Sequence, residues 1–415
     1  MLKALVIAGS CPQIILLGQL KERGIYTILA DNNVNAVARP YADEFVKVDI
    51  LKTDAVRQVA QEKKVDFLIA VCADQVLLTV SKVSEELGLP CYIDYETACK
   101  VSDKGHMKDI FRQYGIPSSK HVFMSELDEA KLTELQYPLV VKPVDAYSSK
   151  GVRKCRNPEE LRRHFQEAAE ISRSGVVIVE EFMEGAELTV DFEIVDGKAV
   201  FLSASNTEKV NYEDRFLAFR TRYPAAVSPE TIERVKVIGQ KLADAFQLKN
   251  TPMLIQLLTD DHRENVLEFS ARTGGGAKYL LVKAVTGFDP ITAVIDLTMG
   301  KKPQVGELRS ECRYLTNEFL YARPGVFDHL EGFEELKQAG VLKEYWQFKW
   351  KGAEIRSAVT SSDRVASITI TANTLEEFIA KHHEACRRIR IIDADGRDIM
   401  RHDLLTPIRP LDIRE

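Results

Sequence analysis

The first 90 residues alternate short apolar runs with helical patterns, and this alternation constrains the fold more than any other feature of the chain. A strand that is followed by a helix and a second strand forms a right-handed βαβ unit in a parallel sheet. We therefore predict an open parallel α/β sheet at the N-terminus. The expected strands are 3–8, 26–31, 45–49 and 67–72, and the expected helices are 12–23, 53–63 and 75–87.

A second unit begins near Val101, with a predicted helix over 104–114 that Ser102 caps and Gly115 ends. Further strands follow, two of them joined by an Asp196-Gly197 hairpin turn. From about residue 306 the chain mixes strands and short helices, so the overall class is α/β followed by α+β. The predicted domains are 1–100, 101–305 with a lid at about 118–184, and 306–415.

The strongest polar pattern lies on two apolar strands, 253–258 and 266–270. If they pair as a hairpin around the intervening turn, Gln256 faces Glu268, and Ser270 lies on the same face. Carboxylate and amide oxygens at one place suit a hard cation such as Mg²⁺. The alternative is an amphipathic hairpin with its polar face in water, and both interpretations stay open on these residues alone.

Arg272 follows this hairpin and has the fork geometry that binds a carboxylate or a phosphate. Three glycines come next, and Gly274 and Gly275 allow backbone N–H groups to approach an anion closely. The glycines favour a site over a solvated hairpin.

Lys142 ends an apolar strand and precedes a loop of small residues that contains Ser148, Ser149 and Gly151. Such a loop can wrap phosphates with backbone donors while the lysine supplies a charge. Taken alone, Lys142 also fits a surface lysine.

The segment 176–187 is an apolar strand that runs into Glu180, Glu181 and Phe182, then a glycine turn, then Glu187. An extended backbone here could bind a purine edge, and Glu187 could accept hydrogen bonds from ribose hydroxyls. A solvated acidic turn is the alternative, because acidic residues are usually exposed.

Three arginines lie close together in the segment 209–223, namely Arg215, Arg220 and Arg222. They predict either a receptor for an anionic substrate or a solvated basic loop. The loops 9–13 and 72–75 are further candidates, because ligands bind at the carboxyl ends of parallel strands.

The bulk composition excludes several functions. The net charge of −6 argues against nucleic acid as the main partner, which needs a concentrated basic surface. The seven cysteines show no zinc or redox spacing, and no stretch approaches the ~20 apolar residues of a membrane span. A cytoplasmic location is expected.

Taken in order, these motifs resemble the ATP-grasp superfamily, in particular carbamoyl phosphate synthetase large chains, purine-biosynthesis members and L-amino acid ligases. The resemblance covers about residues 1–300 and extends weakly to the C-terminal part. It implies ATP with Mg²⁺ or Mn²⁺ as cofactors. It also implies the following roles: Lys104, Lys142, Ser148, Ser149 and Gly151 at the ATP phosphates; Glu180, Glu181 and Phe182 at the adenine; Glu187 at the ribose; Gln256, Glu268 and Ser270 at the metal; and Arg272 at the acyl phosphate.

The resemblance implies a carboxylate–amine ligase that forms an acyl phosphate and releases ADP and phosphate, acting on an amino acid or a similar small carboxylate. Relatives are often dimers, so a homodimer is expected. Many relatives carry Asn where this chain has Ser270, which brings the second metal site into question. The alternatives are a purine-pathway enzyme acting on a ribotide, and a nucleotide-binding module without catalysis.

Overall fold

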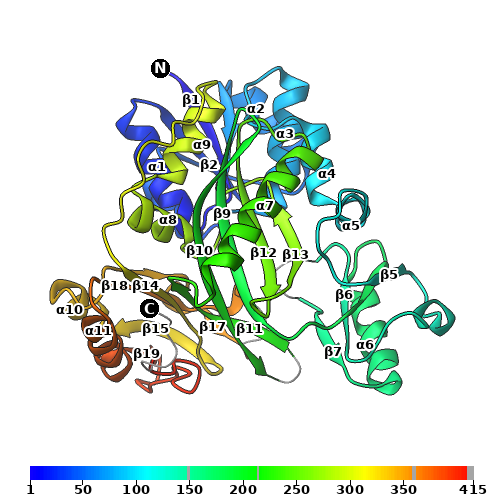
Figure 1. Ribbon diagram of the computed structural model, residues 1–415. Coiled ribbons are helices and arrows are strands. Elements are labelled where there is room, and N and C mark those ends of the chain that lie inside the picture. Colours follow the sequence, from blue (N-terminus) through cyan, green and yellow to red (C-terminus); the bar gives the residue numbers. More distant parts are fainter. Residues whose placement is uncertain (147–149, 213–214, 358–360, 409–415) are drawn as a thin grey trace.

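The computed structural model describes residues 1–146, 150–212, 215–357 and 361–408. Figure 1 shows an N-terminal layer of helices and strands at the top and a long, twisted sheet through the centre. A small sheet with one helix lies at the lower right, and the C-terminal part lies at the lower left. Ser148 and Ser149 are outside the described residues.

The N-terminal sheet has the strand order β3-β2-β1-β4, and every neighbouring pair is parallel. This confirms the parallel sheet expected from the alternating pattern. The strands are β1 Lys3–Ile7, β2 Tyr26–Asp31, β3 Glu44–Lys47 and β4 Phe67–Ile69, and the helices are α1 Cys11–Glu22, α2 Thr53–Lys63, α3 Leu77–Leu87, α4 Tyr95–Ser102 and α5 Lys104–Gln113.

The predicted cap of α5 is wrong. Asp103 is the N-cap, and its side chain accepts hydrogen bonds from the backbone N–H groups of Gly105 and His106. Ser102 instead ends α4, a helix that the sequence pattern did not predict.

The large sheet has eight strands in the order β13-β12-β9-β10-β11-β14-β18-β16, and its neighbouring strands are antiparallel. Pairing of β11 with β14 joins residues on either side of the expected boundary at 305/306, and the division into three domains stays a prediction. The strands are β9 Ala186–Val195, β10 Lys198–Tyr212, β11 Arg215–Tyr223, β12 Thr251–Thr259, β13 Glu264–Ser270, β14 Tyr314–Leu320, β16 Glu344–Gln347 and β18 Ala366–Ala372.

The β12–β13 hairpin has the register that the sequence predicts, with Gln256 paired to Glu268 and Leu254 paired to Ser270. The register shifts directly after Gln256, so that Leu257 pairs with Val266. The predicted alignment of polar residues is therefore confirmed at the end of the hairpin that carries Glu268 and Ser270.

A second antiparallel sheet, β5-β8-β6-β7, is formed only by residues of the expected lid. One helix, α6, packs against it and shares a small separate core with it. The bounds are β5 His121–Met124, β6 Leu139–Pro143, β7 Arg153–Cys155, α6 Pro158–Ile171 and β8 Val177–Glu181.

Two helices after the glycine-rich loop, α8 and α9, return to the N-terminal layer, where Ile291, Val294 and Ile295 share a core with Leu16 and Leu20 of α1. The C-terminal part adds a three-stranded sheet, β17-β15-β19, and two helices. No helix in the described parts of the chain has the length and apolar character needed to cross a membrane. The bounds are α8 Lys278–Thr286, α9 Pro290–Thr298, β15 Gly325–Glu331, α10 Phe333–Gln338, β17 Glu354–Ile355, α11 Leu375–Arg388 and β19 Arg390–Asp393.

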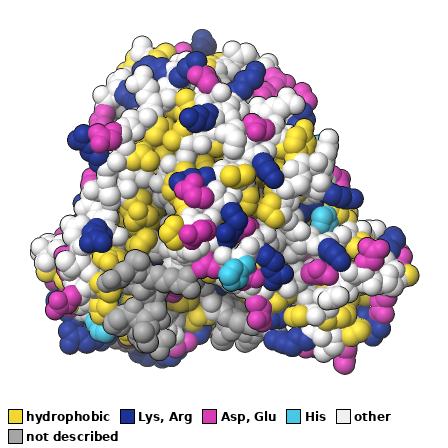
Figure 2. Space-filling view, viewed as in Figure 1, with side chains coloured by type: hydrophobic (Ala, Val, Ile, Leu, Met, Phe, Trp, Pro, Cys, Tyr) yellow, Lys and Arg dark blue, Asp and Glu magenta, His cyan; other side chains and the backbone are white. Residues whose placement is uncertain are grey.

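The visible face of the molecule carries charges of both signs, with Lys and Arg side chains interspersed among Asp and Glu (Figure 2). Apolar side chains lie between them in small groups. Scattered apolar surface of this kind is normal for a folded protein.

Helix α7, Pro229–Ala245, covers the apolar face of β9 and β12, and its close approach depends on Gly239. A Cβ atom at position 239 would lie 2.5 Å from Cζ of Phe192, whose ring is buried against Phe201. The glycine therefore allows the helix and the sheet to pack closely.

We predict that Gly239→Ala lowers the free energy of unfolding by about 1 kcal/mol, because crowding of the Phe192 ring outweighs the higher helix propensity of alanine. Urea denaturation would measure the change. In a Phe192→Leu background the smaller side chain should relieve the crowding, so the same substitution should cost less. Strictly additive effects would contradict this explanation.

Candidate functional site

A cavity opens beside the β12–β13 hairpin, where three distant segments of the chain meet. The N-terminal layer contributes Asp74, the first turn of α5 contributes Lys104, and the hairpin contributes its polar row and Arg272. The full lining is Asp74, Val101, Ser102, Lys104, Met107, Leu254, Gln256, Glu268, Phe269, Ser270 and Arg272. One cavity is therefore lined by five of the predicted site residues: Lys104, Gln256, Glu268, Ser270 and Arg272.

Lys104 faces Glu268 across this cavity, with Nζ 3.4 Å from Oε2, and it donates a hydrogen bond of 3.0 Å to the carbonyl of Ala146. The Lys104 ammonium group lowers the pKa of Glu268, although burial and the nearby Asp74 act in the opposite direction. Glu268 is therefore an anion at neutral pH. Ala146 precedes the predicted phosphate loop, so Lys104 also lies at the start of that loop.

Arg272 is bound by Asp74, a residue that the sequence analysis did not single out. Nε of Arg272 donates to Oδ1 of Asp74 at 2.6 Å, Nη2 donates to Oδ2, and Ser270 donates to Oδ1 at 2.6 Å. Burial alone would raise the pKa of Asp74, but Arg272 and Ser270 lower it overall. The only sequence signal was the position of Asp74 after a parallel strand.

Lys142 and Glu180 form a buried ionic cluster with Lys108. Of these three residues, Lys108 was not among the predicted site residues. Glu180 lies 2.7 Å from Nζ of Lys142 and 3.5 Å from Nζ of Lys108. Lys108 is 2% exposed, and it also donates to Ser118 at 2.6 Å. Burial lowers the pKa of Lys108 to about 8, and the two lysines hold the pKa of Glu180 at about 2 against the effect of burial.

The Lys108 cluster connects the lid sheet to the core of the molecule. Lys108 lies one turn after Lys104 on α5, whereas Lys142 and Glu180 belong to the lid strands β6 and β8. The signal that could have revealed Lys108 is its spacing of four residues from Lys104, which places both on one side of the helix. The Glu180 carboxylate binds these lysines, so it does not lie in a solvated acidic turn.

The other residues of the predicted adenine and ribose region lie at the end of the lid strand β8 and at the start of β9 in the large sheet. The ammonium nitrogen of Lys154 lies 3.6 Å from the centroid of the Phe182 ring. The backbone N–H of Phe182 donates a hydrogen bond to the carbonyl of Pro138. Glu181 accepts a hydrogen bond from the backbone of Gln136. Glu187 is paired with Lys209 at 2.6 Å on the large sheet.

The glycine-rich loop packs against the large sheet and the N-terminal layer. At Gly274, a Cβ atom would lie 2.7 Å from Lys278 Cβ and 3.1 Å from Asp191 Oδ1, and at Gly275 it would approach the carbonyl of Cys72. Only glycine fits this first position without displacing a neighbour. Gly151 has a positive φ of 74°, as a tight loop requires.

Two of the three arginines in the segment 209–223 are buried. Arg220 is 3% exposed and pairs with Glu318 at 2.7 Å and with Glu208 at 3.1 Å. Arg222 pairs with Glu208 at 2.8 Å. The expectation of a solvated basic loop is wrong for these two, because both lie on strand β11 in ion pairs. The side chain of Arg215 is outside the described residues.

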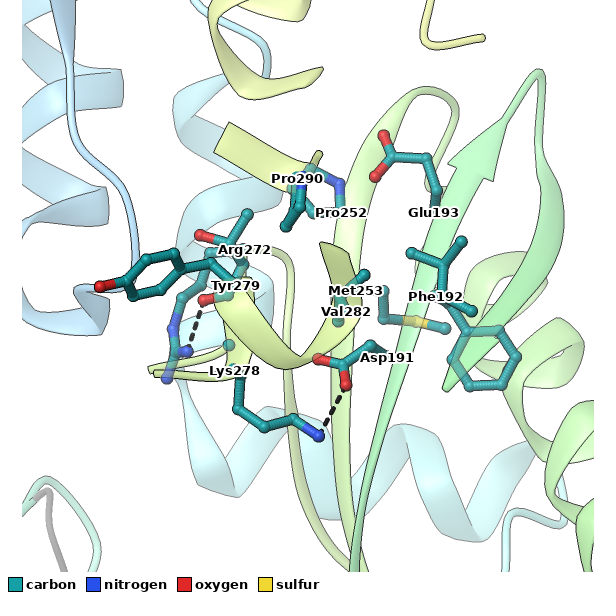
Figure 3. Close-up of a pocket in the computed structure, with 13 residues that line it drawn as sticks. Asp191, Phe192, Glu193, Pro252, Met253, Arg272, Lys278, Tyr279, Val282 and Pro290 are labelled. Atoms are coloured by element: carbon teal, nitrogen blue, oxygen red, sulfur yellow. Dashed lines mark hydrogen bonds and ion pairs between the residues drawn. The ribbon is translucent and has the colours of Figure 1, made fainter. Parts of the chain in front are cut away.

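A second, smaller cavity is lined by residues of the glycine-rich loop, of helix α8 and of strand β9 (Figure 3). Lys278 pairs there with Asp191 at 2.8 Å, while Glu193 on the same strand points away from that pair. Glu193 is fully buried, and neither carboxylate oxygen has a hydrogen-bond partner in the described structure. Burial raises the pKa of Glu193 to about 8, so the group is largely a neutral acid at pH 7.

The polar row of the hairpin fits a magnesium ion by its donor type. Gln256, Glu268 and Ser270 offer amide, carboxylate and hydroxyl oxygens, the ligands that hard cations prefer. Within the described ranges, no group of three or more His, Cys, Asp or Glu side chains could hold a metal. A metal at this place would therefore be held by a mixed set of oxygens.

Two family models match separate parts of the chain. The family model described as "ATP-grasp domain" matches residues 135–279, and the one described as "L-amino acid ligase C-terminal domain 2" matches residues 318–393. The carbamoyl phosphate synthase large chain of Clostridium acetobutylicum is 22% identical over 321 residues, which are 72% of this chain and 29% of that protein. The chain therefore spans less than a third of that relative's length.

Solved structures share nearly the whole fold. The L-amino acid ligase from Bacillus licheniformis is 22% identical with a TM-score of 0.78, over 95% of this chain and 99% of that one. A second structure is the biotin carboxylase domain of Hydrogenobacter thermophilus 2-oxoglutarate carboxylase, solved with MgADP. It is 17% identical with a TM-score of 0.77, over 98% of this chain and 93% of that one. The fold is therefore an ATP-grasp fold. Residues 135–279 match the ATP-grasp domain, and the resemblance inferred from the motif order is confirmed.

We predict that Glu180→Gln lowers the free energy of unfolding by about 3 kcal/mol, because it leaves two buried ammonium groups without their shared counter-charge. Chemical denaturation at pH 7 would measure this. Glu181→Gln is the matched control on the adjacent, more exposed residue, and it should change the stability by less than about 0.5 kcal/mol. Equal effects of the two substitutions would contradict a buried charge cluster.

A pH-dependent effect should appear at Glu193. Its pKa in the folded state is raised above the unfolded value, so the stability associated with burying the neutral acid is fully present below about pH 4.5. That stability is lost as the pH rises toward 8. Glu193→Gln should therefore become more stable relative to the wild type between pH 6 and pH 9, by at least about 1 kcal/mol. Denaturation curves of the two proteins at both pH values test this, and a constant difference would contradict it.

Proposed function

We propose that this chain is an ATP- and Mg²⁺-dependent carboxylate–amine ligase that forms an acyl phosphate on an amino acid or a similar small carboxylate. The observation that carries the proposal is the convergence of Lys104 with Glu268 and Arg272 on one cavity, although Lys104 lies 164 and 168 positions before them in sequence. The ATP-grasp fold and the solved relative that holds MgADP support it.

The reaction brings two anions together, the substrate carboxylate and the γ-phosphate of ATP. Lys104 and Lys142 would bind the phosphates, and the predicted loop with Gly151 would cover them. Gln256, Glu268 and Ser270 would hold Mg²⁺, which neutralises developing charge on the phosphate oxygens. Arg272 would orient the carboxylate in line with the γ-phosphate. An amine then attacks the acyl carbon, loses a proton, and displaces phosphate.

Two features bear on the alternatives. Arg220 and Arg222 are buried and pair with Glu318 and Glu208, so the phosphate of a ribotide would have to compete with these carboxylates. Glu268 is anionic beside Lys104, as a metal ligand must be, which supports the metal assignment. The three-domain division, a homodimer and a cytoplasmic location belong to the same proposal.

We predict that purified protein with ATP and Mg²⁺ forms ADP and phosphate when pooled amino acids are added, and not with ribotides. Glu268→Gln should reduce this rate at least about 100-fold, because it removes a charged ligand from the metal. A coupled ADP assay measures the rate, and circular dichroism confirms the fold. Glu134→Gln, on an exposed lid residue, is the control. Near-normal turnover by Glu268→Gln would refute the metal assignment. ATP binding without turnover of any carboxylate would favour a nucleotide-binding module without catalysis.

A further inference from the structure

The fork of Arg272 is already occupied by a carboxylate. Nε and Nη2 of Arg272 both donate to Asp74, and the remaining Nη1 donates to the carbonyl of Thr273 at 2.7 Å. A guanidinium group that is bound in this way has no free pair of parallel donors for a second carboxylate. A substrate that binds Arg272 through its carboxylate must therefore take the place of Asp74.

Displacing Asp74 would separate its carboxylate from the guanidinium group that it binds. Asp74 and Glu268 line the same cavity, and each carboxylate already has a cation from another segment as its partner, Arg272 for Asp74 and Lys104 for Glu268. A substrate that brings only a negative charge would add a third carboxylate and remove the partner of Asp74. Leaving a partly buried charge unpaired is costly, so such a substrate binds poorly.

A substrate with an ammonium group next to its carboxylate avoids this cost. Its carboxylate replaces Asp74 on Arg272, and its ammonium group gives Asp74 a new partner. The geometry allows this exchange, because the Asp74 side chain is 31% exposed and faces the cavity. The adjacent backbone has its own anchor, a 3.0 Å hydrogen bond from Cys72 N–H to Oγ1 of Thr273. The side chain can therefore turn while the two loops stay joined.

We propose that Asp74 receives the ammonium group of a zwitterionic substrate, an α-amino acid or the N-terminal end of a short peptide-like acid, whose carboxylate binds Arg272. This inference rests on the proposed function and names the charge pattern of its carboxylate substrate. Asp74 is then a specificity-determining residue on the N-terminal layer, and it selects against hydroxy acids of the same shape.

The test compares matched pairs of acids that differ only in an amino or a hydroxyl group: L-alanine with L-lactate, L-leucine with L-2-hydroxyisocaproate, and L-phenylalanine with L-phenyllactate. ATP-dependent ADP formation is measured for each, with hydroxylamine as a common acceptor for the acyl phosphate. The wild type should prefer the amino acid of the best pair by at least about tenfold in kcat/KM. Asp74→Asn should bring that ratio close to one, mainly through a higher KM for the amino acid.

Asp94→Asn is the matched control, because it removes a carboxylate from the same part of the chain while Asn can still cap α4. It should keep the wild-type preference. The ratio is measured within one enzyme preparation, so a loss of folded protein does not alter it. If Asp74→Asn does not fold, the same ratio is measured for Asp74→Ser, which should also bring it close to one.

The outcomes separate this inference from the function on which it rests. Equal use of amino and hydroxy acids by the wild type, or an unchanged ratio in Asp74→Asn, would overturn the role of Asp74 while leaving the ligase intact. No ADP with any carboxylate would overturn both.

Discussion

The candidate site depends on the matching of partly and fully buried charges that distant parts of the chain supply. Glu268 faces Lys104, Asp74 binds Arg272, and Glu180 lies between Lys108 and Lys142. Each acid would be costly in these surroundings without its cation. Because the partners belong to different structural elements, every pair also fixes how two elements lie relative to each other. The same contacts that would bind nucleotide and substrate therefore hold the parts of the fold together.

Helix α5 has a central position in this arrangement. Its first residue, Lys104, faces the hairpin, and Lys108 one turn later contacts the lid strand β8 through Glu180. A movement of the lid would therefore act on the helix that carries a candidate phosphate ligand. The ionic cluster at Lys108 gives the lid a charged attachment point, whereas the lid's own small core keeps its sheet intact. This combination suits a part that moves as a unit.

Local patterns in the sequence predicted much of the fold and part of the site. The period of two in strands β12 and β13, together with the polar turn between them, was enough to predict the pairing of Gln256 with Glu268, since side chains alternate along strands and a short turn fixes the register. The parallel N-terminal sheet followed from alternating strands and helices. The same reasoning placed the cap of α5 on Ser102, because Ser and Asp are both favourable N-cap residues, and it missed the short helix α4, which ends directly before the cap Asp103.

The sequence by itself determined which residues could form the site, because strand periodicity, glycine spacing and residue chemistry are local properties. Only the tertiary structure decided which charges meet. Asp74 lies 198 positions before Arg272, and Lys108 lies 72 positions before Glu180, so no local pattern connects them. The burial of Arg220 and Arg222 could not be predicted either, because the sequence does not distinguish an arginine in a buried ion pair from an arginine in water. These pairings follow from the packing of whole elements, which place the charges close together where water is largely excluded.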